Sequence, residues 1–335
     1  MDTFRGLFIF LLATIMFILA SINAQGLRSV DRRRAAFSFF KRKHFDIILV
    51  QETHWTDDIR QDIERDWGGE IVMSCGDNHS RGVAILFRPH LDYTIDHRHT
   101  DNNGRIATTI FTIDETTFNL IAIYAPRTDA ERVTFFSEFA PLFSPTHPNI
   151  LGGDFNCISN AKMDKRGGNP LARQAAISTL GTSIVNHNLV DIWRTQHPHT
   201  HAFTWTGKNP TDNSPILTRI DRFYIAHAIS HLAANSDIKP YPHSDHDLIS
   251  LQLDLSRTPR GKGYWHFNNT LLANASFNTD LIAFWQRWLT KKADFDNILT
   301  WWDKAKFHFK QIAIHHTSKA RKIANTQCHA IESNI

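Results

Sequence analysis

Four polar side chains follow apolar runs of the sequence, at points where a buried strand would end. Asn23, Glu52, Tyr124 and Asp154 all have this placement. Strands that run in the same direction deliver such residues to one rim of a sheet, which is where α/β folds commonly place their sites. Carboxylate, amide and phenol groups gathered at one rim would suit chemistry on a phosphate group.

The Gly152-Gly153 pair before Asp154 is the most informative local feature. Two glycines at the end of an apolar strand weaken it unless the backbone must bend or approach another group closely. In Asp154-Phe155-Asn156, alternation along the chain places the carboxylate and the amide on one side and buries Phe155 on the other. An acid beside a hydrogen-bond donor suits a site that activates water and steadies a phosphoryl oxygen.

Taken one at a time, these residues also have ordinary structural explanations. A glutamate after a strand is usually a solvated loop carboxylate, and an asparagine there is usually a turn former. More polar groups lie downstream: Thr204, the run Arg219-Ile220-Asp221-Arg222, and the run Ser244-Asp245-His246-Asp247. The first run alone would fit a surface ion-pair ladder, and the second an Asx-type turn. Their joint occurrence in this order favours a functional site.

The elements that must position these residues are visible in the hydrophobic pattern of residues 17–255. Short runs rich in Ile, Val, Phe and Thr predict strands at 17–22, 46–50, 70–74, 82–87, 106–113, 117–124, 149–153, 222–226 and 248–255. Helical patterns occur at 31–43, 57–66, 129–143 and 171–186. Many strands with fewer helices predict an α/β fold, a four-layer sandwich of two face-to-face mixed sheets flanked by helices.

One predicted helix, at residues 129–143, carries a start signal. Thr128 and Glu131 have the spacing of a capping box. Apolar residues then recur on one face of the predicted helix: Val133, Phe136, Ala140 and Phe143.

The composition changes after residue 255. Residues 256–263 read as a linker, and patterns at 279–292 and 296–325 predict helices, so we place a boundary near residue 256. Residues 256–335 carry a net charge of +7, whereas residues 1–255 carry −3. Because Trp residues are interleaved with the lysines, RNA or DNA contact and a merely solvated basic surface are equal alternatives for this segment.

Length and cysteine usage limit the classes of protein that fit. A chain of 335 residues with 42% hydrophobic content can bury one large core and a smaller appendage. Three cysteines lie far apart, with no pairing at zinc-site spacing, so neither a disulfide framework nor a structural zinc is indicated. This fits an intracellular compartment.

The N-terminus has two competing interpretations. The apolar run from Leu7 to Ala20 resembles a signal peptide or membrane anchor, but it is short for a membrane span. Alternatively, residues 17–22 form the first buried strand and residues 1–16 are an accessory extension. Cleavage after Ala24 would remove that strand together with Asn23 and expose a sheet edge, which favours the second interpretation.

Six motifs, taken together, resemble those of the endonuclease/exonuclease/phosphatase superfamily. The closest resemblance is to the apurinic-type endonuclease domain of LINE-type retrotransposons, over about residues 17–255. The motifs are Asn23, Gln51-Glu52-Thr53-His54, Ile123-Tyr124-Ala125-Pro126, Gly153-Asp154-Phe155-Asn156, Arg219-Ile220-Asp221-Arg222 and Ser244-Asp245-His246. Residues 263–272 are similar to the segment that leads to the reverse transcriptase in such elements.

The resemblance implies a magnesium-dependent site. Glu52 would bind Mg²⁺, with Mn²⁺ as a substitute, helped by Asn23 and Asp245, because a small hard cation prefers few carboxylates together with waters and phosphate oxygens. The first motif usually reads Asn-x-Asn-Gly, whereas here it ends in Gln25-Gly26. The essential asparagine is therefore present, and the departure concerns local DNA contacts.

The resemblance also implies catalytic roles. Asp154 would orient or deprotonate the attacking water, Asn156 would donate to the phosphoryl oxygen, and Tyr124 would steady the developing charge. His246 would contact the scissile phosphate while Asp221 fixes its ring. Two further residues would bind the substrate, namely Thr204 and Ser244.

The function so implied is nicking of double-stranded DNA to leave a 3′-hydroxyl, which primes reverse transcription in these elements. The DNA substrate implies a nuclear or cytoplasmic location, and no obligate protein partner is inferred. Two alternatives stay open: another phosphodiesterase or phosphatase of the same superfamily, and a catalytically silent nucleic-acid-binding remnant.

Overall fold

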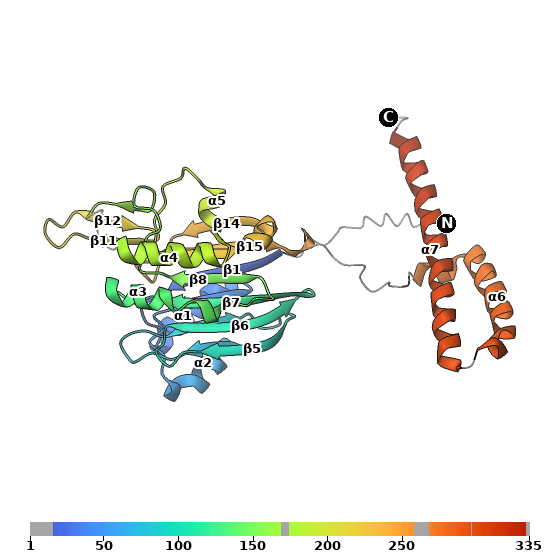
Figure 1. Ribbon diagram of the computed structural model, residues 1–335, viewed down its shortest axis with the longest axis horizontal. Helices are drawn as coiled ribbons and strands as arrows, with labels where there is room; N and C mark the ends of the chain where they lie inside the picture. The colour runs from blue at the N-terminus through green and yellow to red at the C-terminus, as the bar shows by residue number, and fades with distance from the viewer. Residues whose placement is uncertain (1–15, 169–173, 258–266, 268, 296, 333–335) are drawn as a thin grey trace. The chain divides into compact units, whose positions relative to one another are not determined.

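A computed structural model describes residues 16–168, 174–257, 267, 269–295 and 297–332 (Figure 1). The chain divides into two compact units, Met1–Thr258 and Pro259–Ile335. In the part of the chain that the structure describes, no helix combines the length and the apolar character that a membrane crossing requires. The expected N-terminal extension and most of the expected linker lie outside the described residues, as does the start of the segment 263–272.

The first sheet contains the N-terminal strand at its centre. Within the described residues it has six strands in the order β14-β15-β1-β2-β4-β3. Their bounds are β1 (Met16–Asn23), β2 (Ile47–Gln51), β3 (Ile71–Ser74), β4 (Val83–Phe87), β14 (Ala233–Lys239) and β15 (Leu248–Asp254). β1 pairs in parallel with β2 and antiparallel with β15. The predicted strand at 17–22 is confirmed.

The second sheet holds the glycine pair. Its order over the described residues is β10-β13-β8-β7-β6-β5. Its strands are β5 (Thr94–Thr100), β6 (Ile106–Ile113), β7 (Thr116–Tyr124), β8 (Asn149–Asp154), β10 (Leu189–Asp191) and β13 (Asp221–Ala226). β7 and β8 are parallel, and β13 is antiparallel to β8. A small third sheet consists of β9 (Lys165–Arg166), β11 (Trp205–Lys208) and β12 (Pro215–Thr218).

The two large sheets pack face to face, with helices on their outer faces (Figure 1). Leu49, Phe111 and Leu251 belong to the apolar layer between the sheets. α1 (Val30–Arg42) and α2 (Arg60–Trp67) cover the first sheet with residues such as Phe37 and Trp67. α3 (Asp129–Ser137) and α4 (Gln174–Asn186) cover the second sheet. The predicted four-layer α/β sandwich is confirmed.

Shorter helices connect these layers. They are η1 (Asp57–Ile59), η2 (Ala140–Leu142), α5 (Ile192–Gln196), η3 (His227–Leu232) and η4 (Leu255–Arg257).

The helix predicted at 129–143 starts as expected and ends early. Thr128 is its N-cap, and the Thr128 hydroxyl accepts a hydrogen bond from the backbone N–H of Glu131. α3 ends at Ser137 because Pro141 has no N–H to donate to the Ser137 carbonyl. The chain then continues as η2, and Phe139 is buried where the single-helix prediction placed Ala140 in the core.

The second unit is a helical hairpin with an aromatic core. It comprises η5 (Asn269–Ala273), α6 (Ala275–Thr290), η6 (Lys292–Asp294) and α7 (Ile298–Glu332). α6 begins four residues before the predicted start at 279, because the Asn274 side chain caps it by accepting from the backbone N–H of Phe277. Trp288, Trp301 and Ala305 pack together in the hairpin.

The glycine pair at the end of β8 lies where neighbouring strands of the chain come very close. A Cβ atom on Gly153 would lie 2.0 Å from the carbonyl oxygen of Ile123, and one on Gly152 would lie 2.5 Å from the ring of Phe223. Gly153 also has a φ of +139°, a conformation that other residues rarely adopt. The expectation that the backbone approaches another group closely is confirmed.

Replacing Gly153 by Ala should therefore lower the free energy of unfolding by at least about 3 kcal/mol, since both the clash and the backbone angle oppose the new methyl group. Gly181 offers a matched control within α4, because a Cβ there meets nothing within 4 Å. Gly181→Ala should stabilise by roughly 0.5–1 kcal/mol. Urea unfolding of both variants checks this, and a Gly153→Ala variant as stable as the wild type would contradict the assigned packing.

Candidate active site

The carboxyl ends of two parallel strand pairs bring the expected residues together. Asn23 ends β1 beside the end of β2, after which Glu52 follows. Tyr124 ends β7 directly opposite Asp154 at the end of β8. The Asn23 amide nitrogen then joins the two sheets, because it lies 3.2 Å from Glu52 Oε1 and 2.9 Å from Asp154 Oδ2. The shared rim expected from the sequence is thus present.

Glu52 is a buried carboxylate at which several donors converge. Its Oε1 accepts from the Tyr124 hydroxyl at 2.5 Å and from Arg127 at 2.9 Å, in addition to Asn23. Its Oε2 lies 3.7 Å from His54 Nε2. Burial acts to raise the pKa of Glu52, but contacts with His54, Tyr124, Arg127 and Asn23 outweigh it and hold the pKa well below its usual range. Glu52 is therefore a carboxylate anion at neutral pH.

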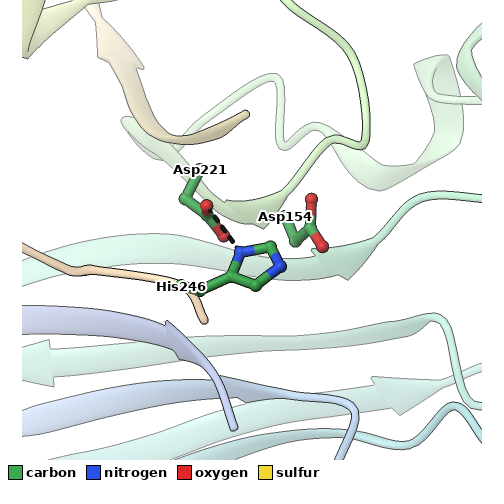
Figure 2. A group of neighbouring side chains, drawn as sticks. All are labelled: Asp154, Asp221 and His246. Carbon is green, nitrogen blue, oxygen red and sulfur yellow. Dashed lines mark hydrogen bonds and ion pairs between the residues drawn. The ribbon is translucent and has the colours of Figure 1, made fainter. Parts of the chain in front are cut away.

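Asp154, Asp221 and His246 form a compact buried cluster (Figure 2). One donor atom from each lies within 4.8 Å of the others. Asp221 is opposite Asp154 in the β8–β13 ladder, and its Oδ2 lies 2.9 Å from His246 Nδ1. The expected pairing of His246 with Asp221 is present in the structure.

The charges in this cluster shift one another. Burial, followed by the nearby Asp221 carboxylate, raises the pKa of Asp154. Burial acts to lower the pKa of His246, but the charge and hydrogen bond of Asp221 outweigh it and raise the pKa to about 10. His246 is therefore a cation at neutral pH, with its Nδ1–H held by Asp221 and its Nε2–H able to donate.

Asn156 is fixed by backbone contacts. Its Nδ2 donates to the carbonyl of Ala125 at 2.9 Å, and its backbone N–H donates to Asp154 Oδ1 at 2.8 Å. Phe155 is fully buried between them, as expected. A φ of +46° at Asn156 turns the chain sharply after Asp154, so that both side chains line the same cleft.

Thr204 and Ser244 support this arrangement through hydrogen bonds to the backbone. Thr204 is only 1% exposed, and its hydroxyl accepts from the backbone N–H groups of Ile220 and Asp221, each at 3.0 Å. These two hydrogen bonds hold the backbone at Asp221, and substrate binding by Thr204 stays a prediction. The Ser244 hydroxyl donates to the Asn23 carbonyl at 2.6 Å and accepts from the His246 N–H at 3.1 Å, so it ties the His246 loop to β1.

Asp245 lies on the cleft wall beside His246. Its Oδ1 is 3.8 Å from His246 Nε2, and its Oδ2 accepts from the indole N–H of Trp205 at 3.0 Å. The cleft has a volume of about 510 Å³. It is lined by Gln25, Glu52, Arg127, Asp154, Asn156, Ile158, Lys165, Gly168, Trp205, Ile216, Thr218, Ile220, Asp245 and His246.

The donor set fits a small hard cation. Three carboxylates, Glu52, Asp154 and Asp221, lie in the site, and oxygen ligands of this kind are those that Mg²⁺ takes. Asp221 Oδ1 is buried with no hydrogen-bond partner among the described residues. A divalent cation would offset the repulsion that raises the pKa of Asp154.

Sequence reasoning missed three residues that line or flank the cleft. Arg127 contacts Glu52, Trp205 contacts Asp245, and His54 packs over Gly26, where a Cβ would lie 2.8 Å from its ring. Arg127 directly follows the motif that contains Tyr124, and His54 is the last residue of the motif that contains Glu52, although no role was assigned to it. Trp205 directly follows Thr204, and no sequence pattern indicated that it would line the cleft.

Residues 219–222 are buried and form a hydrogen-bonded and ion-paired segment, called here the buried anchor. The alternative of a surface ion-pair ladder is wrong. Arg219 is 1% exposed and contacts Asp164 at 2.8 Å and Asp191 at 2.6 Å. Arg222 is also buried and donates to the Tyr224 hydroxyl at 2.8 Å. The anchor holds the chain on either side of Asp221.

Fold and site together define a nuclease-like hydrolase: two packed sheets with a buried Asp, Asp and His cluster at one rim. Residues 20–246 match the endonuclease/exonuclease/phosphatase family, and the chain belongs to this family. It is 29% identical over 321 residues to the Transposon TX1 uncharacterized 149 kDa protein of Xenopus laevis. This alignment covers 95% of the chain and 24% of the relative, so the chain spans about a quarter of the relative's length.

Two solved structures share the fold. An AP endonuclease from Leishmania major has a TM-score of 0.58 at 16% identity, covering 71% of this chain and 88% of that one. An AP endonuclease from Archaeoglobus fulgidus has a TM-score of 0.57 at 17% identity, covering 71% of this chain and 99% of that one.

The buried anchor should make stability depend on Asp164. Burial acts to raise the pKa of Asp164, but the charges of Arg219 and Arg222 outweigh it and hold the pKa well below its usual range. Asp164→Asn should therefore lower the free energy of unfolding by about 3 kcal/mol at neutral pH, because it leaves Arg219 partly unpaired.

Because the pKa of Asp164 is lower in the folded protein than in the unfolded chain, ionised Asp164 stabilises the fold at pH values above its unfolded pKa. This stabilisation is lost as the pH falls through the folded-state pKa. The difference between wild type and Asp164→Asn should thus shrink below about pH 4 in denaturant titrations. Asp62→Asn, which breaks an exposed pair with Arg65, is the control and should change stability little. A difference that stays constant down to low pH would contradict the assigned pairing.

Proposed function

We propose that this chain is a magnesium-dependent endonuclease that nicks double-stranded DNA and leaves a 3′-hydroxyl. The observation that carries the proposal is the buried Asn23 amide that joins Glu52 to Asp154, beside the Asp221–His246 pair. Glu52, Asp154 and His246 line one cleft. In this proposal Glu52 is an anionic oxygen ligand, Asp154 is a water-binding carboxylate and His246 is a cationic donor.

Glu52 would hold the cation with help from Asn23, and Asp245 lies on the wall of the same cleft. When bound, Mg²⁺ supplies positive charge that stabilises the phosphate oxygens as a bond to phosphorus breaks. Tyr124 keeps Glu52 in place through its hydroxyl and approaches the same space from β7.

Asp154 would orient the attacking water and accept its proton, and its raised pKa, caused by burial and Asp221, supports this role. His246 presents its Nε2–H to a phosphate oxygen, while Asp221 fixes the ring through Nδ1. Asn156, held by Ala125, steadies the phosphoryl group from the side of β8.

The choice of DNA rests on the relatives. The names of the solved structures describe AP endonucleases, and the similar Xenopus laevis protein is named for a transposon. In a transposon, a nick that leaves a 3′-hydroxyl would prime reverse transcription. A DNA substrate implies that the protein is located in the nucleus or the cytoplasm. A location inside the cell also keeps β1, which a signal cleavage after Ala24 would remove from the centre of its sheet.

Substitution of the site carboxylates offers the direct test. Supercoiled plasmid should be nicked in Mg²⁺ and left intact in EDTA. Glu52→Ala and Asp154→Ala should each retain less than about a tenth of wild-type nicking at saturating Mg²⁺, with thermal melts close to wild type. Glu64→Gln, an exposed change in α2, serves as the control. Higher residual activity would sink the roles, and metal-independent binding without nicking would favour a silent nucleic-acid-binding module.

The basic helical unit should add affinity to the nuclease unit. A chain ending at Arg257 should still nick, because the residues of the cleft all precede that point. It should bind DNA more weakly and with a shallower dependence on salt, since residues 256–335 carry a net charge of +7. Fluorescence anisotropy across a salt series measures both. Loss of cleavage in a folded truncated chain would show that the helical unit takes part in the chemistry.

A further inference from the structure

Arg127 is a charged residue of the cleft that the proposed chemistry does not use. Its guanidinium lies 2.9 Å from Glu52 Oε1, and its Nε lies 3.2 Å from the Tyr124 hydroxyl. The two sides of this ion pair differ in exposure, since the Arg127 side chain is 73% exposed and that of Glu52 is 10% exposed. Arg127 thus reaches from solvent to the carboxylate to which the metal-binding role is assigned.

The backbone at Arg127 is held by a buried side chain, whereas the Arg127 side chain is mostly exposed to solvent. The guanidinium of Arg132, which is 1% exposed, donates to the carbonyl of Arg127 at 2.6 Å and to that of Pro126 at 3.1 Å. Thr128 then caps α3. A long side chain on a fixed pivot can move its guanidinium by several ångströms without disturbing the fold.

Glu52 Oε1 has no capacity left for a cation while all its donors are in place. A carboxylate oxygen offers about two lone-pair directions, and this one is contacted by Asn23, Tyr124 and Arg127. Asn23 and Tyr124 are buried, so their positions are fixed by packing. Arg127 is exposed and positively charged, so it is the donor that an incoming cation would displace most readily.

We propose that Arg127 is an internal counter-ion of Glu52 that a divalent cation displaces into the cleft, where the guanidinium binds a phosphate of the nucleic acid. The inference rests on the proposed metal-dependent function. Arg127 in this role opposes metal binding in the free protein and favours substrate binding in the metal-loaded protein. Since guanidinium and phosphate match in geometry and charge, the released side chain gains a strong partner.

The first measurement is calorimetric titration of the full chain with Mn²⁺ in the absence of nucleic acid. Arg127→Ala should bind Mn²⁺ about fivefold more tightly than wild type, a modest factor because the displaced guanidinium is largely exposed. Arg65→Ala is a matched control, since the Arg65 side chain is 71% exposed and is paired with Asp62 in α2. This control should bind Mn²⁺ as wild type does.

The second measurement is the affinity for a short DNA duplex, by anisotropy, in EDTA and in Ca²⁺. In EDTA, Arg127 is occupied by Glu52, so Arg127→Ala should bind the duplex nearly as wild type does. In Ca²⁺ the variant should bind about tenfold more weakly, because the released guanidinium is missing. Arg65→Ala should match wild type in both buffers.

The outcomes separate this inference from the proposed function. Wild type that binds no Mn²⁺ overturns the metal dependence and the inference with it. Wild type that binds Mn²⁺, beside an Arg127→Ala variant that binds it equally or more weakly, overturns the counter-ion role alone. An equal loss of duplex affinity in EDTA and in Ca²⁺ overturns the displacement, since Arg127 would then contact DNA whether or not metal is present. Circular dichroism melts confirm that each variant is folded.

Discussion

The hydrogen bonds from the Asn23 amide to Glu52 and Asp154 are the constraint on which the site depends. They join residues 131 positions apart along the chain and link the rims of two different sheets. They can form only if β1 keeps its place between β2 and β15, because a shift of one residue would turn Asn23 to the other face. The face-to-face packing of the sheets therefore sets the chemistry as well as the core.

Keeping three carboxylates in so small a space requires compensating groups. Each carboxylate has a different one: Glu52 has Arg127 and the Tyr124 hydroxyl, Asp221 has His246, and Asp154 has the Asn23 amide. Asp154 accepts a hydrogen bond from a neutral amide, and burial together with the nearby Asp221 carboxylate raises its pKa.

The sequence predicted the buried strands and the rim well, because those strands are apolar on both faces and each ends in a polar residue. It missed β5 and β14, which lie at sheet edges, because their exposed polar residues hide the strand pattern. The roles of Glu52, Asp154 and His246 required the family resemblance, since spacing alone does not show which strands are neighbours. The sequence does not show that Arg219 is buried, because its partners Asp164 and Asp191 lie far from it along the chain.

The small third sheet meets the site at the start of β11. Trp205, the first residue of β11, forms a bridge with His246 and a hydrogen bond to Asp245. The far end of the β11–β12 hairpin closes on itself, since the Asn209 N–H donates to the Ser214 carbonyl at 2.8 Å. Residues 209–214 can therefore change in length and composition over evolutionary time while the reacting groups keep their positions.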